Sequence, residues 1–123
     1  MAVVKTVTNV LSNKTAGTSA STTLTDCTTV DTSDFINLAV VVRLTFNASA
    51  TLGARVKAFA SNDDSTYNTY PFWQADIAFT SGAQAQAFQM PSGPKYVKFQ
   101  VTNLDAAQTI TAIYVDTHDQ TIT

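Results

Sequence analysis

One short stretch of the chain gathers residue types that could bind a ligand or perform catalysis. Residues 58–73 read AFASNDDSTYNTYPFW, and they place the adjacent Asp63 and Asp64 shortly before Trp73, the single tryptophan. Carboxylate oxygens on a loop suit calcium, a carboxylate pair suits glycoside hydrolysis, and exposed aromatic rings can stack on sugars. The same stretch could also be an ordinary turn, so the rest of the chain has to decide between these interpretations.

The acidic run Asn62-Asp63-Asp64 is interpreted as a turn without a metal ion. It lacks the regular spacing and the glycine of a calcium-binding D-x-D-x-D-G loop. Two adjacent carboxylates on a strand would point to opposite faces, which does not suit a catalytic dyad. Asn and Asp side chains often accept hydrogen bonds from the backbone of their own turn. We therefore expect the run to satisfy its own backbone.

Five aromatic residues around this loop form the candidate contact surface. Three uses stay open for them: stacking on a glycan, contact with another protein, or packing at one end of the fold. Among the functional uses, contact with a neighbouring protein is preferred. The five residues are Phe59, Tyr67, Tyr70, Phe72 and Trp73.

The remaining chemistry-bearing residues do not form a catalytic or metal-binding pattern. His118 is the only histidine, and a zinc site would need further His, Cys or Glu ligands that the chain lacks. No G-x-S-x-G motif presents a serine nucleophile. Cys27 is the single cysteine and is expected to be a small buried hydrophobic residue. We expect no catalytic residue, no bound metal, no cofactor and no enzyme activity.

Length and composition favour one folded domain and disfavour several partners. The 123 residues are 45% hydrophobic and 13% charged, which is too apolar for a disordered chain. No apolar run is long enough to span a membrane, and the net charge of −2 with scattered basic residues gives no support for nucleic-acid binding. The first residues lack the continuous apolar segment of a secretion signal, so we expect the chain to be used without export.

Strands are expected throughout, because threonine is abundant and glutamate is absent. The segment Phe35–Phe46 alternates apolar and polar residues and is predicted to be a central strand. Residues 96–102 and 109–117 are predicted to close the sheet, followed by a polar tail. The predicted core consists of Ile36, Leu38, Val40, Val42, Leu44, Val97, Phe99 and Val101.

The other segments give weaker signals. Residues 2–11 are expected to form a strand, and residues 12–34 either short edge strands or an extended arm. In the predicted strand Ala54–Ser61, Phe59 falls on the polar face, which indicates a bulge, a partner contact or a wrong register. Residues 72–81 and 84–90 are predicted to form a hairpin around Gly82-Ala83.

These segments together predict an all-β fold, an antiparallel jelly-roll-like β-sandwich of about seven or eight strands. The chain is expected to be a single domain overall. Residues 1–34 would form an N-terminal arm and edge strands, and residues 35–123 the body of the sandwich.

Residues 54–116 resemble known small jelly-roll proteins. The resemblance rests on RVKAFASNDDSTYNTYPFW, PKYVKFQVTN and TITAIYVD, which match a strand, a Ser-Asn-Asp loop followed by an aromatic residue, and two closing strands. Two groups look similar: discoidin-like carbohydrate-binding modules, and small virion surface proteins of tailed bacteriophages, including capsid decoration (cement) proteins and tail-associated β-domains. The chain lacks the paired cysteines of the first group, which favours the second.

The second resemblance implies a non-enzymatic virion structural protein. It implies a capsid decoration protein, made in the host cytoplasm, that stabilises the shell by contact with the major capsid protein or other virion proteins. Such a protein is expected to be a homo-oligomer, with a trimer favoured. The arm would then carry attachment, so deleting residues 1–30 should weaken attachment more than it unfolds the body. The alternative is a discoidin-like glycan- or receptor-binding module acting through the aromatic loop.

Overall fold

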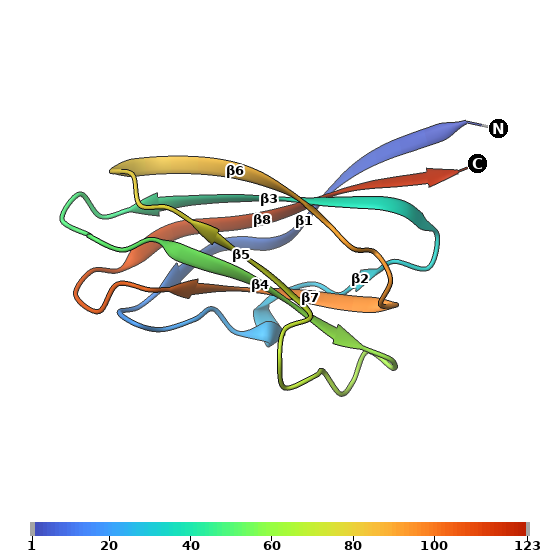
Figure 1. The fold of residues 1–123 in the computed structure, drawn as a ribbon, viewed down its shortest axis with the longest axis horizontal. Coiled ribbons are helices and arrows are strands. Elements are labelled where there is room, and N and C mark those ends of the chain that lie inside the picture. Colours follow the sequence, from blue (N-terminus) through green and yellow to red (C-terminus); the bar gives the residue numbers. More distant parts are fainter. Residues whose placement is uncertain (1, 123) are drawn as a thin grey trace.

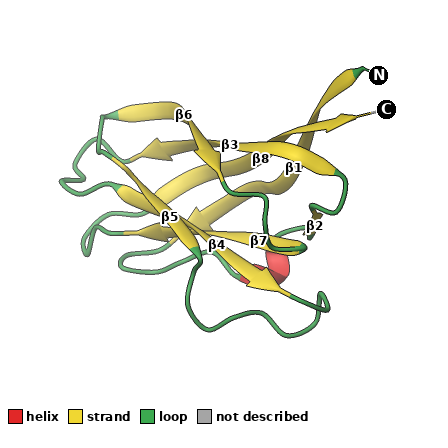
Figure 2. Ribbon diagram, turned by 45° about the vertical axis from the view of Figure 1, so that its right-hand side comes forward, coloured by secondary structure: helices red, strands yellow, loops and turns green. Residues whose placement is uncertain are grey.

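Eight strands form two four-stranded antiparallel sheets in the computed structural model, which describes residues 2–122 (Figure 1). Sheet A has the order β1-β8-β3-β6, and sheet B has the order β2-β7-β4-β5. The only helical element among the described residues is a single 3-10 turn, η1 (Leu24–Asp26) (Figure 2). The strands are β1 (Val3–Ala16), β2 (Val30–Asp31), β3 (Phe35–Phe46), β4 (Ala54–Ser61), β5 (Trp73–Ile77), β6 (Gly82–Met90), β7 (Tyr96–Asn103) and β8 (Ile110–Ile122).

The pairing of the strands is that of a jelly roll. The first strand pairs with the last, β2 with β7, β3 with β6, and β4 with β5. This is the winding of an eight-stranded, double-sheet jelly roll. The predicted all-β, jelly-roll-like sandwich is therefore confirmed. No helix among residues 2–122 is long and apolar enough to cross a membrane.

The alternating side chains of β3 form the centre of the core. Leu38, Val40, Val42 and Leu44 are almost fully buried, and they face a second buried set on β7 that includes Phe99. Seven of the eight predicted core residues are confirmed: Leu38, Val40, Val42, Leu44, Val97, Phe99 and Val101.

Ile36 was wrongly predicted to lie in the core. Its side chain is 50% exposed, because the register between β3 and β8 shifts between Phe35 and Asn37. Such an irregularity inserts an extra residue and reverses the faces of the side chains on one side of it. Alternation alone cannot show where the shift lies.

Residues 10–34 belong to the sandwich. Val10 and Leu11 are both buried although they are adjacent, because the register of β1 against β8 shifts between Asn9 and Leu11. Further along, Cys27 and Val30 also join the core, which confirms the prediction for Cys27. Deleting residues 1–30 would remove these core side chains, so only residues before Asn9 can be removed without cutting into the core.

Two further expectations from the sequence are corrected. The segments on either side of Gly82 do not form a hairpin, because β5 lies in sheet B and β6 lies in sheet A. Gly82 does adopt a left-handed φ of 92°, so the turn signal was right and the partner was wrong. Residues 118–122 are not a loose polar tail, since they continue β8 and pair with β1.

Candidate functional site

The acidic loop between β4 and β5 is held by its own carboxylates. The side chain of Asp63 accepts hydrogen bonds from the backbone N–H groups of Ser65 and Thr66, both at 2.9 Å. These two donors, together with the Ser61 hydroxyl, lower the pKa of Asp63 below its ordinary value. The expectation that this run satisfies its own turn is confirmed for Asp63.

Asp64 ties the same loop to a distant segment. It has a left-handed φ of 58°, and its carboxylate accepts hydrogen bonds from the hydroxyls of Thr29 and Tyr67, each at 2.6 Å. Partial burial and then the Asp64 carboxylate raise the pKa of Tyr67 to about 12. Both acidic side chains are thus engaged with protein groups, and the geometry gives them a structural role in the loop.

The five aromatic residues of the candidate contact surface do not form one platform. Phe59 is buried, and the backbone of the loop is hydrogen-bonded to β4 on both sides of it, at Ala58 and Ala60. Phe72 and Trp73 pack against the core, where Trp73 meets Phe88 edge to face with ring centroids 5.8 Å apart. Tyr67 is half-buried below Lys98. Tyr70 alone of the five is fully exposed, at 81%.

A second surface was not identified from the sequence. Residues 3–9 of β1 pair with residues 116–122 of β8 at the end of sheet A that carries both chain termini (Figure 1), and residues 116–121 of β8 pair on their other side with the first half of β3. We call this paired segment of β1 and β8 the ribbon. It exposes an unusual share of apolar side chains: Val3 at 56%, Val4 at 40%, Val7 at 62% and Ile122 at 48%.

The ribbon also has an open edge. β1 is the outermost strand of sheet A, with β8 on one side only. Along its other side, the first backbone partner among the described residues is Thr28, whose N–H donates to the carbonyl of Val10 at 2.8 Å. Residues 3–9 therefore present unpaired backbone groups beside exposed valines, which is a template for pairing with another strand. The signal in the sequence was a run of β-branched residues with one charge near the chain end.

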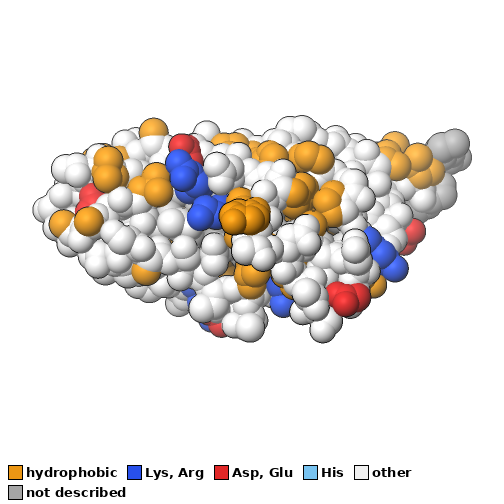
Figure 3. Space-filling model, turned by 60° about the horizontal axis from the view of Figure 1, so that its bottom comes forward, with side chains coloured by type: hydrophobic (Ala, Val, Ile, Leu, Met, Phe, Trp, Pro, Cys, Tyr) orange, Lys and Arg blue, Asp and Glu red, His pale blue; other side chains and the backbone are white. Residues whose placement is uncertain are grey.

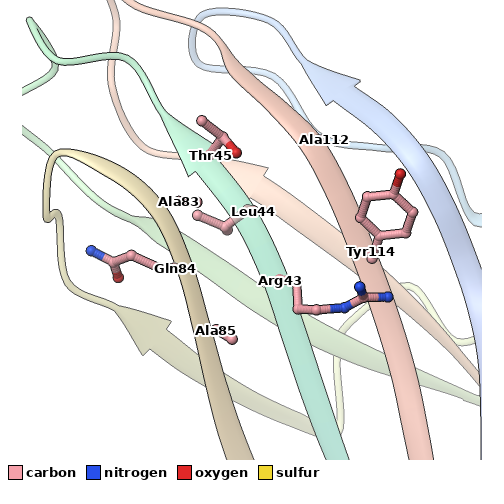
Figure 4. A pocket seen from close by; sticks show the side chains of 8 residues that line it. All are labelled: Arg43, Leu44, Thr45, Ala83, Gln84, Ala85, Ala112 and Tyr114. Atoms are coloured by element: carbon pink, nitrogen blue, oxygen red, sulfur yellow. The ribbon is translucent and has the colours of Figure 1, made fainter.

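The outer face of sheet A holds a shallow hollow of about 380 Å³ (Figure 4). On one side, the Arg43 guanidinium lies 4.5 Å from the centroid of the Tyr114 ring and 3.1 Å from the carboxylate of Asp116. On the other side, Ala83 and Ala85 of β6 leave the surface smooth. The one charged group that lines the hollow, Arg43, is held by Tyr114 and Asp116, so the hollow offers a contact surface.

Charge and metal-ligand chemistry give no further centre. Figure 3 shows Lys, Arg and Asp side chains in small separate groups over one face of the molecule. Within residues 2–122, no three His, Cys or Asp side chains come together in a way that could hold a metal ion. His118 lies on β8 between Val7 of β1 and Ala39 of β3.

Comparison with known proteins supports the fold. No protein-family model matches the chain, and no curated protein matches it in sequence. Two solved structures are similar over nearly the whole chain. One is a protein of Bacillus endospore appendages, described as disulfide-linked pili, with a TM-score of 0.52 and 12% identity, covering 98% of this chain and 89% of that chain. The other is the SPBc2 prophage-derived protein YomS, with a TM-score of 0.52 and 13% identity, covering 98% of this chain and 96% of that chain.

Proposed function

We propose that this chain is a non-enzymatic structural protein of a phage particle, and within that class a capsid decoration protein that binds the major capsid protein. The observation that carries the proposal is the ribbon, with its exposed valines and its open strand edge. The copies on the shell would associate around its symmetry axes, with a trimer as the favoured unit.

The ribbon is the part of the molecule that gains most from a partner. Full burial of one valine side chain contributes about 1.5–3 kcal/mol, and β1 exposes Val3 and Val7 on one face and Val4 on the other. Exposed apolar residues scattered singly are ordinary on a protein surface, whereas exposed apolar residues along an open strand edge form an association site or an aggregation hazard. A stable attachment to a larger assembly would cover it.

The structural neighbours are compatible with this role. One neighbour belongs to pili and the other is prophage-derived, so the same fold occurs in an assembled filament and in a phage-related protein. At 12–13% identity they support the fold, and the role of this chain rests on its own surface.

Labelling the chain in its natural setting tests the proposal directly. Antibody-gold electron microscopy of particles released by the source cell should place the label evenly over the shell. Label on the tail would replace decoration with a tail-associated role, and label on no particle would contradict the proposal.

A matched pair of variants tests the part played by the ribbon. Val7→Asp places a charge on the ribbon, whereas Leu52→Asp places one on a residue that is 52% exposed in the loop between β3 and β4. Val7→Asp should weaken attachment to particles that lack the protein at least tenfold, and Leu52→Asp should leave it unchanged. Equal attachment of both variants would remove the ribbon from the proposal.

The glycan-binding alternative depends on Tyr70, because the other aromatic residues of the loop are wholly or partly buried. Binding to a glycan array that disappears in Tyr70→Ala would favour this alternative over decoration.

A further inference from the structure

Sheet A has two open edges that lack the usual protection against pairing with another chain. One is residues 3–9 of β1, which pair with β8 without a register shift, and the other is β6 (Figure 1). The only strand that pairs with β6 among residues 2–122 is β3, over nine consecutive residues without a shift. β6 reads GAQAQAFQM and contains no charge and no proline. Charges, prolines and bulges are what normally protect an edge strand, so both edges can accept a further strand.

The edges of sheet B are protected. β2 has only two residues, and one of them is Asp31. β5 has five residues and begins shortly after Pro71. It also carries Asp76, whose carboxylate lies 2.6 Å from the guanidinium of Arg55 on β4. Short length and charge discourage pairing, so the contrast between the sheets indicates that sheet A is the one that continues into another molecule.

The strand directions in sheet A allow its two edges to pair with each other. All neighbours in the order β1-β8-β3-β6 are antiparallel, so β1 and β6 run in opposite directions. A second copy placed beside the first in the same orientation therefore presents its β6 antiparallel to β1. This arrangement satisfies both edges, whereas a two-fold pairing of β6 with itself would leave the edge of β1 open.

The two edges also match in the faces of their side chains. Residues that pair on neighbouring antiparallel strands lie on the same face of the sheet. Val7 pairs with His118, and His118 pairs with Ala39. Ala39 in turn pairs with Gln89 of β6. The odd-numbered residues of both edge segments therefore lie on the outer face of sheet A, and the even-numbered residues lie on the inner face.

One register gives all of residues 3–9 a partner in β6 and keeps the faces matched. It places Val3 opposite Gln89 and Asn9 opposite Ala83. A shift by one residue would bring outer side chains opposite inner ones. A shift by two residues would restore the faces but would carry one end of the pairing beyond β6.

This register gives the exposed apolar residues of the ribbon suitable neighbours. On the outer face, Val7, which is 62% exposed, lies opposite Ala85, whose small side chain leaves room for the branched one. On the inner face, Val4 lies opposite Phe88, an aromatic ring that is only partly buried. Pairs of a β-branched and an aromatic residue stabilise antiparallel strands. Lys5, the single charge in residues 3–9, meets no like charge, because β6 has none.

We propose that residues 3–9 of one copy pair with β6 of the next copy, head to tail and in this register, so that sheet A continues from chain to chain. A contact between two different surfaces closes into a ring or continues as a filament. The inference deepens the proposed function and rests on it for the size of the ring, which is the trimer favoured there. The end of the ribbon, with Val3 and Ile122, stays available for contact with the shell.

Engineered disulfides between copies test the register. A chain carrying Val7→Cys and Ala85→Cys should form cross-linked oligomers under mild oxidation, seen on non-reducing gels, because the two thiols lie opposite each other between copies. Within one chain they lie on opposite edges of sheet A and cannot bridge. Cys27 is buried and stays out of the reaction. The matched control combines Val7→Cys with Gln86→Cys, which lies on the other face, and should cross-link at least tenfold less.

Analytical ultracentrifugation measures the association without cross-links. Ala85→Lys places a charge on the edge of β6 and should lower the association constant at least tenfold. Ala48→Lys, the same change in the exposed loop between β3 and β4, should leave the association constant unchanged.

Two outcomes overturn this inference. One is an unmodified chain that stays monomeric at roughly 1 mM. The other is efficient cross-linking by Gln86→Cys or Val7→Cys alone, which would show a two-fold pairing of one edge with itself. Either outcome together with gold label over the shell would leave the proposed function standing. Oligomers cross-linked in the expected register, with label on no particle, would keep the edge pairing and contradict the proposed function.

Discussion

Each end of the sandwich holds an aspartate with little exposed surface, but only one end supplies hydrogen-bond donors to it. At one end, Asp105 is 4% exposed and accepts hydrogen bonds from the backbone N–H groups of Thr51, Leu52, Ala107 and Gln108, at 2.8–3.2 Å. At the ribbon end, Asp119 is 6% exposed and has no donor among residues 2–122. The pKa of Asp105 is held far below its ordinary value, whereas that of Asp119 is raised. Burial alone does not set the behaviour of a carboxylate; the donors around it do.

The difference separates a closed end from an open one. Asp105 joins the loop between β7 and β8 to the loop between β3 and β4, so the two connections act as one unit. The ribbon end has unsatisfied backbone groups, exposed valines and an unpartnered carboxylate. The loops at the first end are joined by hydrogen bonds within the chain, whereas the second end keeps an open strand edge, on which the proposed attachment rests.

Replacing Asp105 should have the largest effect on the fold. Asp105→Ala leaves four backbone N–H groups without their acceptor and disconnects two loops. We expect the largest fall in melting temperature of the variants discussed, measured by circular dichroism. Asp34→Ala is the control, and an equal, small change in both would show that the closed end does not depend on Asp105.

Two substitutions on β3 separate its buried part from its start near the ribbon. Val40→Ala should lower the free energy of unfolding by about 1–3 kcal/mol, because Val40 is fully buried and a cavity would remain. Ile36→Ala should change it by less than about 0.5 kcal/mol, because that side chain is half exposed. Urea unfolding measures both values. A larger loss for Ile36 than for Val40 would contradict the register described for β3.

The two aspartates should also respond oppositely to pH. Folding lowers the pKa of Asp105, so its contribution is complete above about pH 4 and is lost as the pH falls through the folded pKa. Folding raises the pKa of Asp119, so its charge destabilises the fold at neutral pH and protonation relieves this as the pH falls toward about 4. Thermal melts between pH 2 and pH 7 should show Asp105→Asn less sensitive to acid than the unchanged chain. They should show Asp119→Asn more stable near neutrality.

The smallest effect on stability is expected at the ribbon itself. Val7→Thr keeps the branched shape of a residue that is 62% exposed and should change the free energy of unfolding by less than about 0.5 kcal/mol. Chemical unfolding provides the measurement. A loss of more than about 1 kcal/mol would show that the ribbon helps to hold the isolated fold, against the comparison of the two ends.

The fold class was predictable because its strongest signals are local. The alternation in β3 and β7 identified the core directly, since a strand buried on one face repeats every two residues. Ile36 was misplaced because a register shift leaves no mark in the composition. Residues 12–34 were ambiguous because their pairing is irregular. Residues 12–16 end β1 with register shifts against β8, and the rest pair with β7 only in short pieces, at Ser21 and at β2.

The same difference between local signals and signals that depend on the whole fold applies to the candidate sites. The turn at Asp63 was predicted correctly because its donors lie two and three residues away. The aromatic residues beside it were treated as one surface, although burial, which depends on the whole fold, separates Phe59 from Tyr70. The ribbon edge depends on which strands become neighbours, and no local pattern contains that information.

The position of the two chain ends has a mechanical consequence. Val3 lies opposite Ile122 on neighbouring antiparallel strands. A pulling force applied between these ends would load one residue pair at a time, starting at this pair. β1 would therefore separate from β8 by breaking their pairs one after another. A force applied between the ribbon and the loops at the far end would instead load many hydrogen bonds along β8 and β3 together. The same molecule is therefore weak when pulled from its own ends and strong when pulled along its length.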